Sequence, residues 1–271
     1  MIGALLEAVI GGAYIGAAAR PSPRGRRWPR SRTACFLAGI ALFAIAVQSP
    51  LAAYDEVPWV HVTQHLVIMM VVPPLLVLGA PITLLLRTAS PRARREIVAV
   101  LRDPAMKPMS GRVAGIGLGL EYYASMFLVM LTPVYKLALE HETVHVAVHA
   151  YMLTCGLLFW TGLVGRDPTG WRPSARTKSI MVTLGIPVYL ALAAIVSSRD
   201  KPLGGLGSLS ATHAAAWPLA VGGVTLTFAG LVLLAAQRTG ARAGSRERWN
   251  ARRMFAISSA MATQQAMARK R

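Results

Sequence analysis

The sequence contains little charge, very few acidic residues and almost no cysteine. Charged residues make up 15% of its 271 positions, against roughly 25% in a soluble domain. Together with a hydrophobic content of 54%, this excludes intrinsic disorder and argues against a water-soluble globule. The two cysteines, Cys35 and Cys155, form no CxxC motif, which excludes a disulfide framework and a thiolate metal site. No GxxxxGK[ST] loop is present, so ATP-driven pumping through such a loop is also excluded.

Long hydrophobic runs dominate the sequence instead. Seven runs each approach the ~20 residues that a helix needs to cross the hydrocarbon core of a bilayer. They cover the ranges 2–19, 33–53, 60–86, 111–134, 143–163, 179–198 and 213–236. The pattern predicts an all-α integral membrane bundle of seven transmembrane helices, formed by residues 1–240. Residues 241–271 are expected to form a basic cytoplasmic tail, in which the helical spacing of Met254, Ile257 and Met261 fits either an interfacial amphipathic helix or a solvated basic surface.

The basic residues predict how these helices are oriented. The 29 Lys and Arg residues outnumber 11 acidic ones, for a formal net charge of +18. All but three of them lie between the apolar runs, in the segments 20–32, 87–112, 164–178 and 237–271. Such segments stay on the cytoplasmic side and face anionic membrane lipids, which excludes nucleic acid as a partner. We therefore expect an outer N-terminus, retained as a helix because its arginines follow the first run, and a cytoplasmic C-terminus.

All six histidines fall at the predicted outer ends of these helices. They are His61, His65, His141, His145, His149 and His213. His61 and His65 are four residues apart, as are His145 and His149, so each pair shares one helical face about 6 Å apart along the axis. Two such pairs at one depth offer imidazole nitrogens, which suit copper, zinc, iron and nickel. We expect these four residues to bind a metal, with His141 as an auxiliary ligand one turn farther out.

Other candidate ligands extend the two histidine pairs. Met69 follows His65 by one helical turn, and Met152 lies three residues beyond His149. Thioether sulfur favours Cu(I), whereas the alternative role of such methionines is core packing. Asp55 precedes the first pair, where a carboxylate would attract a cation or accept a hydrogen bond from a ligand ring.

Two enzymatic or redox functions fit parts of the same pattern. Residues 141–145 read HETVH, the HExxH motif in which a glutamate, here Glu142, is the general base of a zinc metalloprotease. That function leaves His61 and His65 unused. Alternatively, opposed histidines on two helices could be axial ligands of haem in a membrane electron carrier.

Two further polar residues keep alternative roles. His213 either caps a helix end or joins the metal site. Glu121 lies near the middle of the fourth run, where an ionisable side chain is costly. It is expected either to act in function or to form a hydrogen bond between helices.

Two sequence blocks resemble the CtaG family of bacterial membrane proteins, which are cytochrome c oxidase assembly factors. They are HVTQHLVIMMVVPPLLVLGAP, from His61 to Pro81, and HVAVHAYMLTCGLLFWTGLVGRDP, from His145 to Pro168. The resemblance extends over roughly residues 48–170. Val62 and Leu66 stand where the family pattern has methionine directly after the first histidines, which weakens a sulfur contribution there.

The resemblance implies a non-enzymatic role in the plasma membrane of a bacterium. It implies that the protein delivers or retains copper for the buried copper–haem centre of the oxidase, and that its partner is the subunit carrying this centre. The ligands carried over are His61, His65, His145 and His149, with His141 as a less regular match. A scaffold that grips a nascent oxidase subunit is the alternative within the same family.

Overall fold

The computed structural model describes residues 2–21, 27–49, 54, 56–101, 103, 112–168, 173–205 and 207–239. Within these residues the secondary structure is helical throughout, and no strand is present. The chain divides into two compact units, Met1–Gly230 and Leu231–Arg271, and the arrangement below is that of the first. Of the second unit, the described residues 231–239 are helical. Asp55 and the predicted tail helix lie outside the described residues.

Helices occupy the predicted apolar runs. In chain order the elements are α1 (Ile2–Ala19), α2 (Arg30–Gln48), α3 (Pro58–Leu66), the π-helix η2 (Val67–Val71), α4 (Val72–Leu78), α5 (Pro81–Thr88), α6 (Pro91–Leu101), α7 (Arg112–Leu131), α8 (Val134–Glu140), α9 (Glu142–Val164), α10 (Ala175–Thr183), α11 (Gly185–Ser197), the 3-10 turn η4 (Leu203–Gly205) and α12 (Leu209–Ala214). A helix over 216–239 follows α12. The all-helical prediction is therefore confirmed for the described part of the chain.

Five helical stretches among the described residues are long and apolar enough to cross a membrane. They are Arg30–Gln48, Pro58–Thr88, Glu142–Val164, Ala175–Ser197 and Leu209–Thr239. A sixth candidate is the pair formed by α7 and α8, which is bent by 65°. Within α1, Gly3–Ala19 is a shorter apolar helix. The protein is thus a helical multi-pass membrane protein with five or six candidate spans, and the predicted seventh crossing and orientation are not confirmed.

Prolines explain two breaks in these spans. Pro133 disfavours a helical conformation of Thr132, so α7 ends and α8 begins across the bend. Pro187 lies just after the break between α10 and α11 and cannot donate a backbone hydrogen bond. Near this break the Tyr123 hydroxyl donates to the Met181 carbonyl. Backbone oxygens inside a bilayer need such partners because lipid supplies none.

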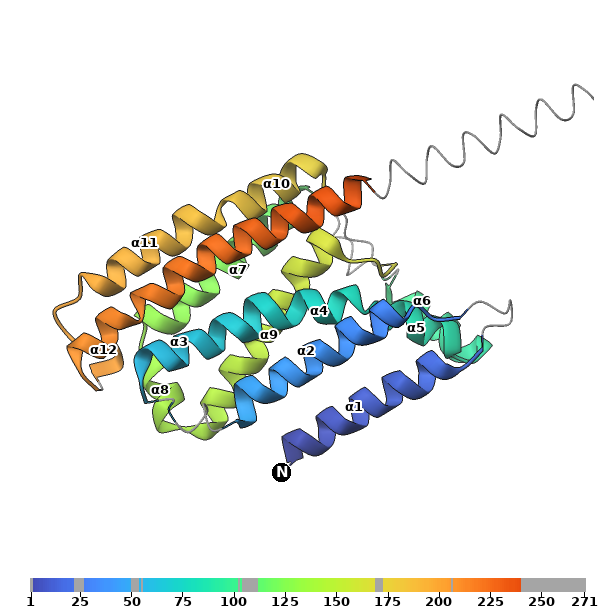
Figure 1. Ribbon diagram of the computed structural model, residues 1–271, viewed down its shortest axis with the longest axis horizontal. Coiled ribbons are helices and arrows are strands. Elements are labelled where there is room, and N and C mark those ends of the chain that lie inside the picture. Colours follow the sequence, from blue (N-terminus) through green and yellow to red (C-terminus); the bar gives the residue numbers. More distant parts are fainter. Residues whose placement is uncertain are drawn as a thin grey trace, which may run out of the picture. The chain divides into compact units, whose positions relative to one another are not determined.

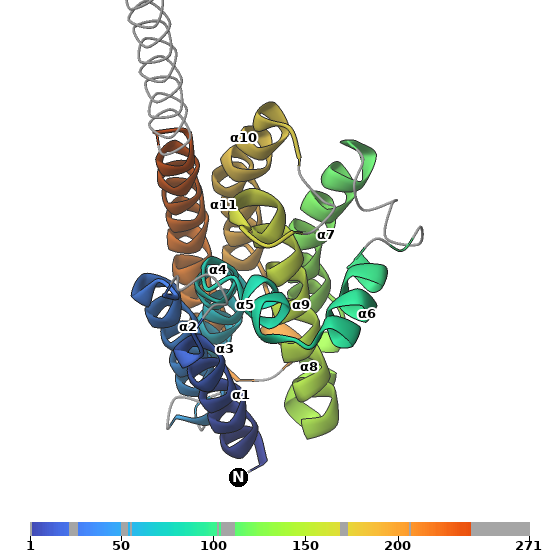
Figure 2. The same ribbon diagram turned by 90° about the vertical axis from the view of Figure 1, so that its right-hand side faces the viewer.

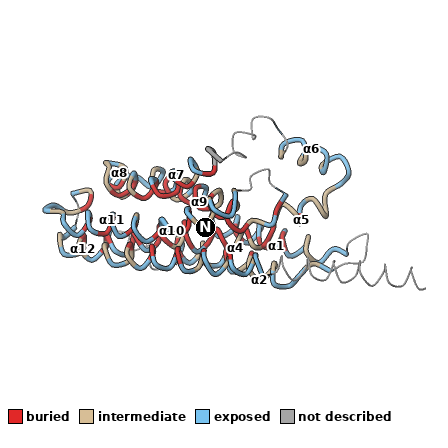
Figure 3. The backbone as a smooth tube through the Cα atoms, turned by 90° about the horizontal axis from the view of Figure 1, so that it is seen from above, coloured by how far each residue is buried: buried red, intermediate tan, exposed pale blue. Residues whose placement is uncertain are grey.

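The segment from α3 through η2 to α4 lies at the centre of the first unit. It packs against α2 on one side and α9 on the other, while α3 also contacts α12. In turn, α9 contacts α7 and α8, and α7 contacts α10 (Figures 1 and 2). Figure 3 shows buried residues along α7 and α9, whereas α6 has none. This arrangement places the first histidine pair directly opposite the second.

Hydrogen bonds of Asp167 connect the segment that follows α9 to the start of α5. Its side chain is buried and accepts hydrogen bonds from the Thr83 amide at 2.7 Å, the Thr83 hydroxyl at 2.6 Å and the Ile82 amide at 3.2 Å. The residue that precedes α5 is Ala80, in the left-handed conformation with φ 53°, and its side chain provides no cap. Asp167 therefore satisfies first-turn amides of α5 from a distant part of the chain.

Candidate metal centre

Two helices carry the four histidines toward one another. On α3, His61 and His65 are completely buried, and on α9 His145 is buried while His149 is half-buried. The four-residue spacing within each pair places both of its rings on one helical face. Because the α3–η2–α4 segment packs against α9, the two faces meet inside the helical bundle.

The four rings contact one another directly. The ring centroids of His61 and His145 lie 5.0 Å apart with nearly parallel planes, and those of His65 and His149 lie 5.2 Å apart and perpendicular. Within each pair the centroids are 4.3 Å apart. Each histidine of α3 is therefore matched by one of α9.

Three of these residues could hold a single metal ion. One ring nitrogen from each of His61, His65 and His145 lies within 4.8 Å of the others. Two nitrogens bound to one metal at about 2.0 Å are roughly 3.3 to 4 Å apart, so adjustments of about 1 Å would close the site. No carboxylate or thiolate of the described residues belongs to this group, so its donors are all imidazoles.

The hydrogen bonding of two histidines fits a metal ligand. Among the described residues, neither ring nitrogen of His65 has a hydrogen-bond partner, and the buried Nε2 of His149 has none. Leaving a buried polar atom unpaired costs about 1–3 kcal/mol. A bound metal ion would use these lone pairs, so the residues present fit such an ion.

An unusually close helix approach brings the two histidine pairs together. After His65 the chain continues as the π-helix η2, and Pro73 lies four residues after Met69. The Met69 carbonyl faces Gly156 of α9, where an added Cβ atom would lie only 2.6 Å from this oxygen and 2.6 Å from Pro73 Cγ. Only glycine leaves room for this contact. Because Gly156 lies seven residues beyond His149, it shares the helical face of the second pair.

His141 does not join the four clustered rings. It is the N-cap residue of α9 in extended backbone, and its side chain is exposed. The HExxH motif therefore spans a helix boundary: its first histidine and Glu142 are exposed, whereas His145 points inward. A metalloprotease motif needs both histidines on one helical face, which this arrangement does not provide.

The two candidate methionines are buried on the expected helices. Met69 and Met152 have no exposed surface, and the Met69 sulfur accepts a weak hydrogen bond from the Ser125 hydroxyl at 3.5 Å. Met69 belongs to η2 and Met152 to α9, so they continue the two histidine-bearing segments. Their predicted role as ligands remains a prediction.

The structure gives His213 and Glu121 partners elsewhere. His213 Nε2 donates to the Arg199 carbonyl at 2.9 Å, because a carbonyl oxygen can only accept, and this bond links α12 to the end of α11. The exposed Glu121 carboxylate accepts a hydrogen bond from the Tyr151 hydroxyl and so connects α7 to α9. Both residues therefore form hydrogen bonds between separate segments of the chain, and their roles remain predictions.

Two polar residues near the histidines escaped the sequence analysis. Tyr135 of α8 is buried, and its ring centroid lies 5.1 Å from that of His61. Gln64 of α3 is buried, and neither atom of its amide has a hydrogen-bond partner among the described residues. The one signal for Gln64 in the sequence is its position between His61 and His65. Tyr135 has no regular spacing from either histidine pair, so no sequence signal pointed to it.

Fold and site together define the class: a helical multi-pass membrane protein with a buried imidazole cluster that could bind a metal. Residues 12–243 match the sequence profile of the cytochrome c oxidase caa3 assembly factor family, Caa3_CtaG. The chain belongs to this family, as the resemblance of its two histidine blocks predicts.

Curated relatives of the chain are mycobacterial proteins. The uncharacterized proteins Mb0105 of Mycobacterium bovis and MT0111 of Mycobacterium tuberculosis are each 29% identical to it over 153 residues, which is 54% of this chain and 23% of the relative. The uncharacterized protein ML1998 of Mycobacterium leprae is 27% identical over 168 residues, 59% of this chain and 25% of the relative. The matched part is thus about a quarter of the length of these proteins. No solved structure matches the chain significantly.

Proposed function

We propose that this protein binds a copper ion between His61, His65, His145 and His149 and delivers it to the copper–haem subunit of cytochrome c oxidase. The observation that carries the proposal is the buried contact of the two histidine pairs, with ring nitrogens of His65 and His149 that have no partner among the described residues. Membership of an oxidase assembly family supplies the biological setting.

The absence of acidic side chains from the histidine group favours a monovalent ion. The cost of burying an ion in a low-dielectric interior rises with its charge, and a nearby opposite charge lowers this cost. The donors of the described group are imidazoles, which suit copper, zinc, iron and nickel. We therefore assign Cu(I) as the bound ion, in preference to Cu(II) or Zn(II).

The packing of the rings argues against haem. Axial ligands hold a porphyrin between them, but the ring centroids of His61 and His145 are stacked at 5.0 Å and those of His65 and His149 lie 5.2 Å apart. Such contacts leave space for an ion and not for a macrocycle. The exposed position of Glu142 likewise argues against a general base next to a metal.

Delivery requires exchangeable ligands and a route to the ion. In the predicted orientation His141 lies at the outer surface, exposed at the start of α9, four residues from His145. We assign it the role of an auxiliary ligand that passes copper to the buried group. Asp55, in the segment before α3, is assigned the capture of the cation. The transfer itself is ligand exchange, in which imidazoles of the oxidase replace those of this protein.

Copper content of the purified protein tests the binding step. The protein would be purified from copper-replete bacteria without added metal, and copper per chain measured by atomic emission. We expect His65→Ala combined with His149→Ala to lose the copper while circular dichroism shows unchanged helix content. His213→Ala is the matched control, because its ring bonds a backbone carbonyl and should leave the copper unchanged. Copper retained by the double variant at the wild-type ratio would refute the ligand assignment.

Oxidase maturation tests the delivery step separately. In bacteria that carry only the double variant, we expect the copper–haem subunit to contain less copper than in bacteria that carry His213→Ala. Full maturation despite a copper-free assembly factor would disprove delivery and leave a scaffold role.

A further inference from the structure

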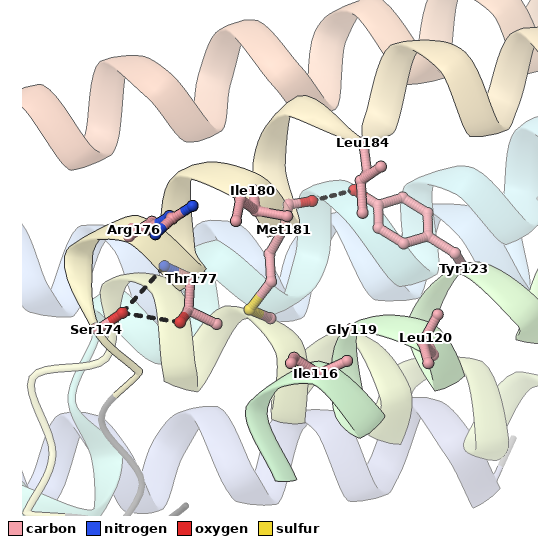
Figure 4. A pocket seen from close by; sticks show the side chains of 10 residues that line it. All are labelled: Ile116, Gly119, Leu120, Tyr123, Ser174, Arg176, Thr177, Ile180, Met181 and Leu184. Carbon is pink, nitrogen blue, oxygen red and sulfur yellow. Dashed lines mark hydrogen bonds between the residues drawn. The ribbon is translucent and has the colours of Figure 1, made fainter. Parts of the chain in front are cut away.

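A cavity of about 460 Å³ lies between α7 and α10. None of its lining residues belongs to the histidine cluster. Ile116 and Leu120 line it from α7 and Ile180 from α10 (Figure 4), and these residues are between 49% and 62% exposed. The cavity is thus bordered by side chains of the outer surface of two candidate spans, a position that lipid can reach sideways.

The two ends of the cavity differ in polarity. Ser174, Arg176 and Thr177 line the end at which α10 begins, where the Ser174 hydroxyl accepts a hydrogen bond from the Thr177 amide at 3.1 Å (Figure 4). At the other end are Leu184 and the ring of Tyr123, whose hydroxyl donates a hydrogen bond to the Met181 carbonyl. The cavity therefore has one polar end with a positive charge and one apolar end.

Its length matches one leaflet of a bilayer. From Ser174 to Leu184 the chain advances ten residues, or about 15 Å of helix. One leaflet contributes about half of the ~30 Å hydrocarbon core. In the predicted orientation α10 begins on the cytoplasmic side, so the polar end lies at the depth of the headgroups and the apolar end near the bilayer centre.

We propose that this cavity binds one anionic phospholipid of the cytoplasmic leaflet. An acyl chain lies along Ile116, Leu120 and Ile180, and the phosphate lies near the Arg176 guanidinium, the charged group of the lining. Basic pockets between transmembrane helices on the cytoplasmic side are suited to anionic headgroups. The phospholipid would fill the space between α7 and α10 and so support α7, which also packs against α9.

Native mass spectrometry of the full chain in mild detergent tests the proposal, with phosphatidylglycerol and phosphatidylcholine as separate probes. We expect the wild type to retain one phosphatidylglycerol and to prefer it over phosphatidylcholine. Gly119→Leu should remove both, because a Cβ there already lies 3.3 Å from Met181 Cγ and the longer side chain enters the cavity. Gly117→Leu on the same helix is the matched control, since nothing lies within 4 Å of its Cβ position.

A charge variant keeps the test independent of packing. Arg176→Gln should lower the preference for phosphatidylglycerol about fivefold, the worth of one basic residue near a lipid surface. Arg95→Gln, on the exposed surface of α6, should leave it unchanged. The proposal would be overturned if the wild type retained the two lipids equally or if Gly119→Leu retained them unchanged. It would also be overturned if the protein formed a dimer that Gly119→Leu abolishes, because a second copy of the chain would then cover the cavity.

Discussion

Gly156→Ala probes the contact that brings the histidine pairs together. The new Cβ atom would lie 2.6 Å from the Met69 carbonyl oxygen, about 0.8 Å inside the 3.4 Å at which ordinary van der Waals contact begins. Because the oxygen belongs to backbone and the other neighbour is the Pro73 ring, the helices have to separate. A shift of this size adds to the adjustment of about 1 Å that the histidine nitrogens already need to share one ion, so it should misplace one histidine pair.

We expect this substitution to weaken copper binding about 10- to 100-fold, the loss that misoriented ligands produce. Overpacking should also lower the free energy of unfolding by about 1–3 kcal/mol. Competition with a coloured Cu(I) chelator in nanodiscs measures the affinity, and Gly117→Ala, whose Cβ meets nothing within 4 Å, is the control. Wild-type affinity in a Gly156→Ala protein of reduced stability would refute the idea that this contact sets the histidine geometry.

Three other substitutions test the interhelical bonds, each by the free energy of unfolding in mixed micelles. Asp167→Ala removes acceptors from two amides and one hydroxyl and should cost about 1–3 kcal/mol; an unchanged value would show that water caps α5 equally well. His213→Ala should lower the free energy of unfolding by about 1 kcal/mol and leave the copper content unchanged. Loss of copper would instead indicate that His213 belongs to the metal centre. Tyr151→Phe deprives Glu121 of its donor and should cost about 1 kcal/mol, whereas Ala147→Ser on the exposed side of α9 should cost little; equal effects would deny the bond any role.

Local spacing predicted the candidate site because its geometry is helical. A four-residue interval puts His61 beside His65, and His145 beside His149, whatever surrounds them, and the structure places the four rings in contact. The matching of the two pairs was also accessible, since both begin predicted spans at the same membrane face. Their role as copper ligands remains a prediction.

Features that depend on helix breaks were not accessible from periodicity. The extended backbone at His141 follows from the end of α8 and removes its ring from the helical face that the spacing predicted. The π-helix η2 and the close approach at Gly156 depend on packing between residues more than 80 positions apart, which no local pattern encodes. Similarly, the fourth run was expected to form one helix over 111–134, and the 65° bend between α7 and α8 was not predicted.

The Asp167 bonds constrain the order in which the protein can be completed during synthesis. Ile82 and Thr83 are translated 85 and 84 residues before the carboxylate that accepts their amide hydrogens. The histidines of α3 likewise precede those of α9 by a comparable stretch of chain. An emerging chain that has inserted its first half therefore has an uncapped α5 and half of the histidine cluster, and both are completed when α9 and the segment after it arrive.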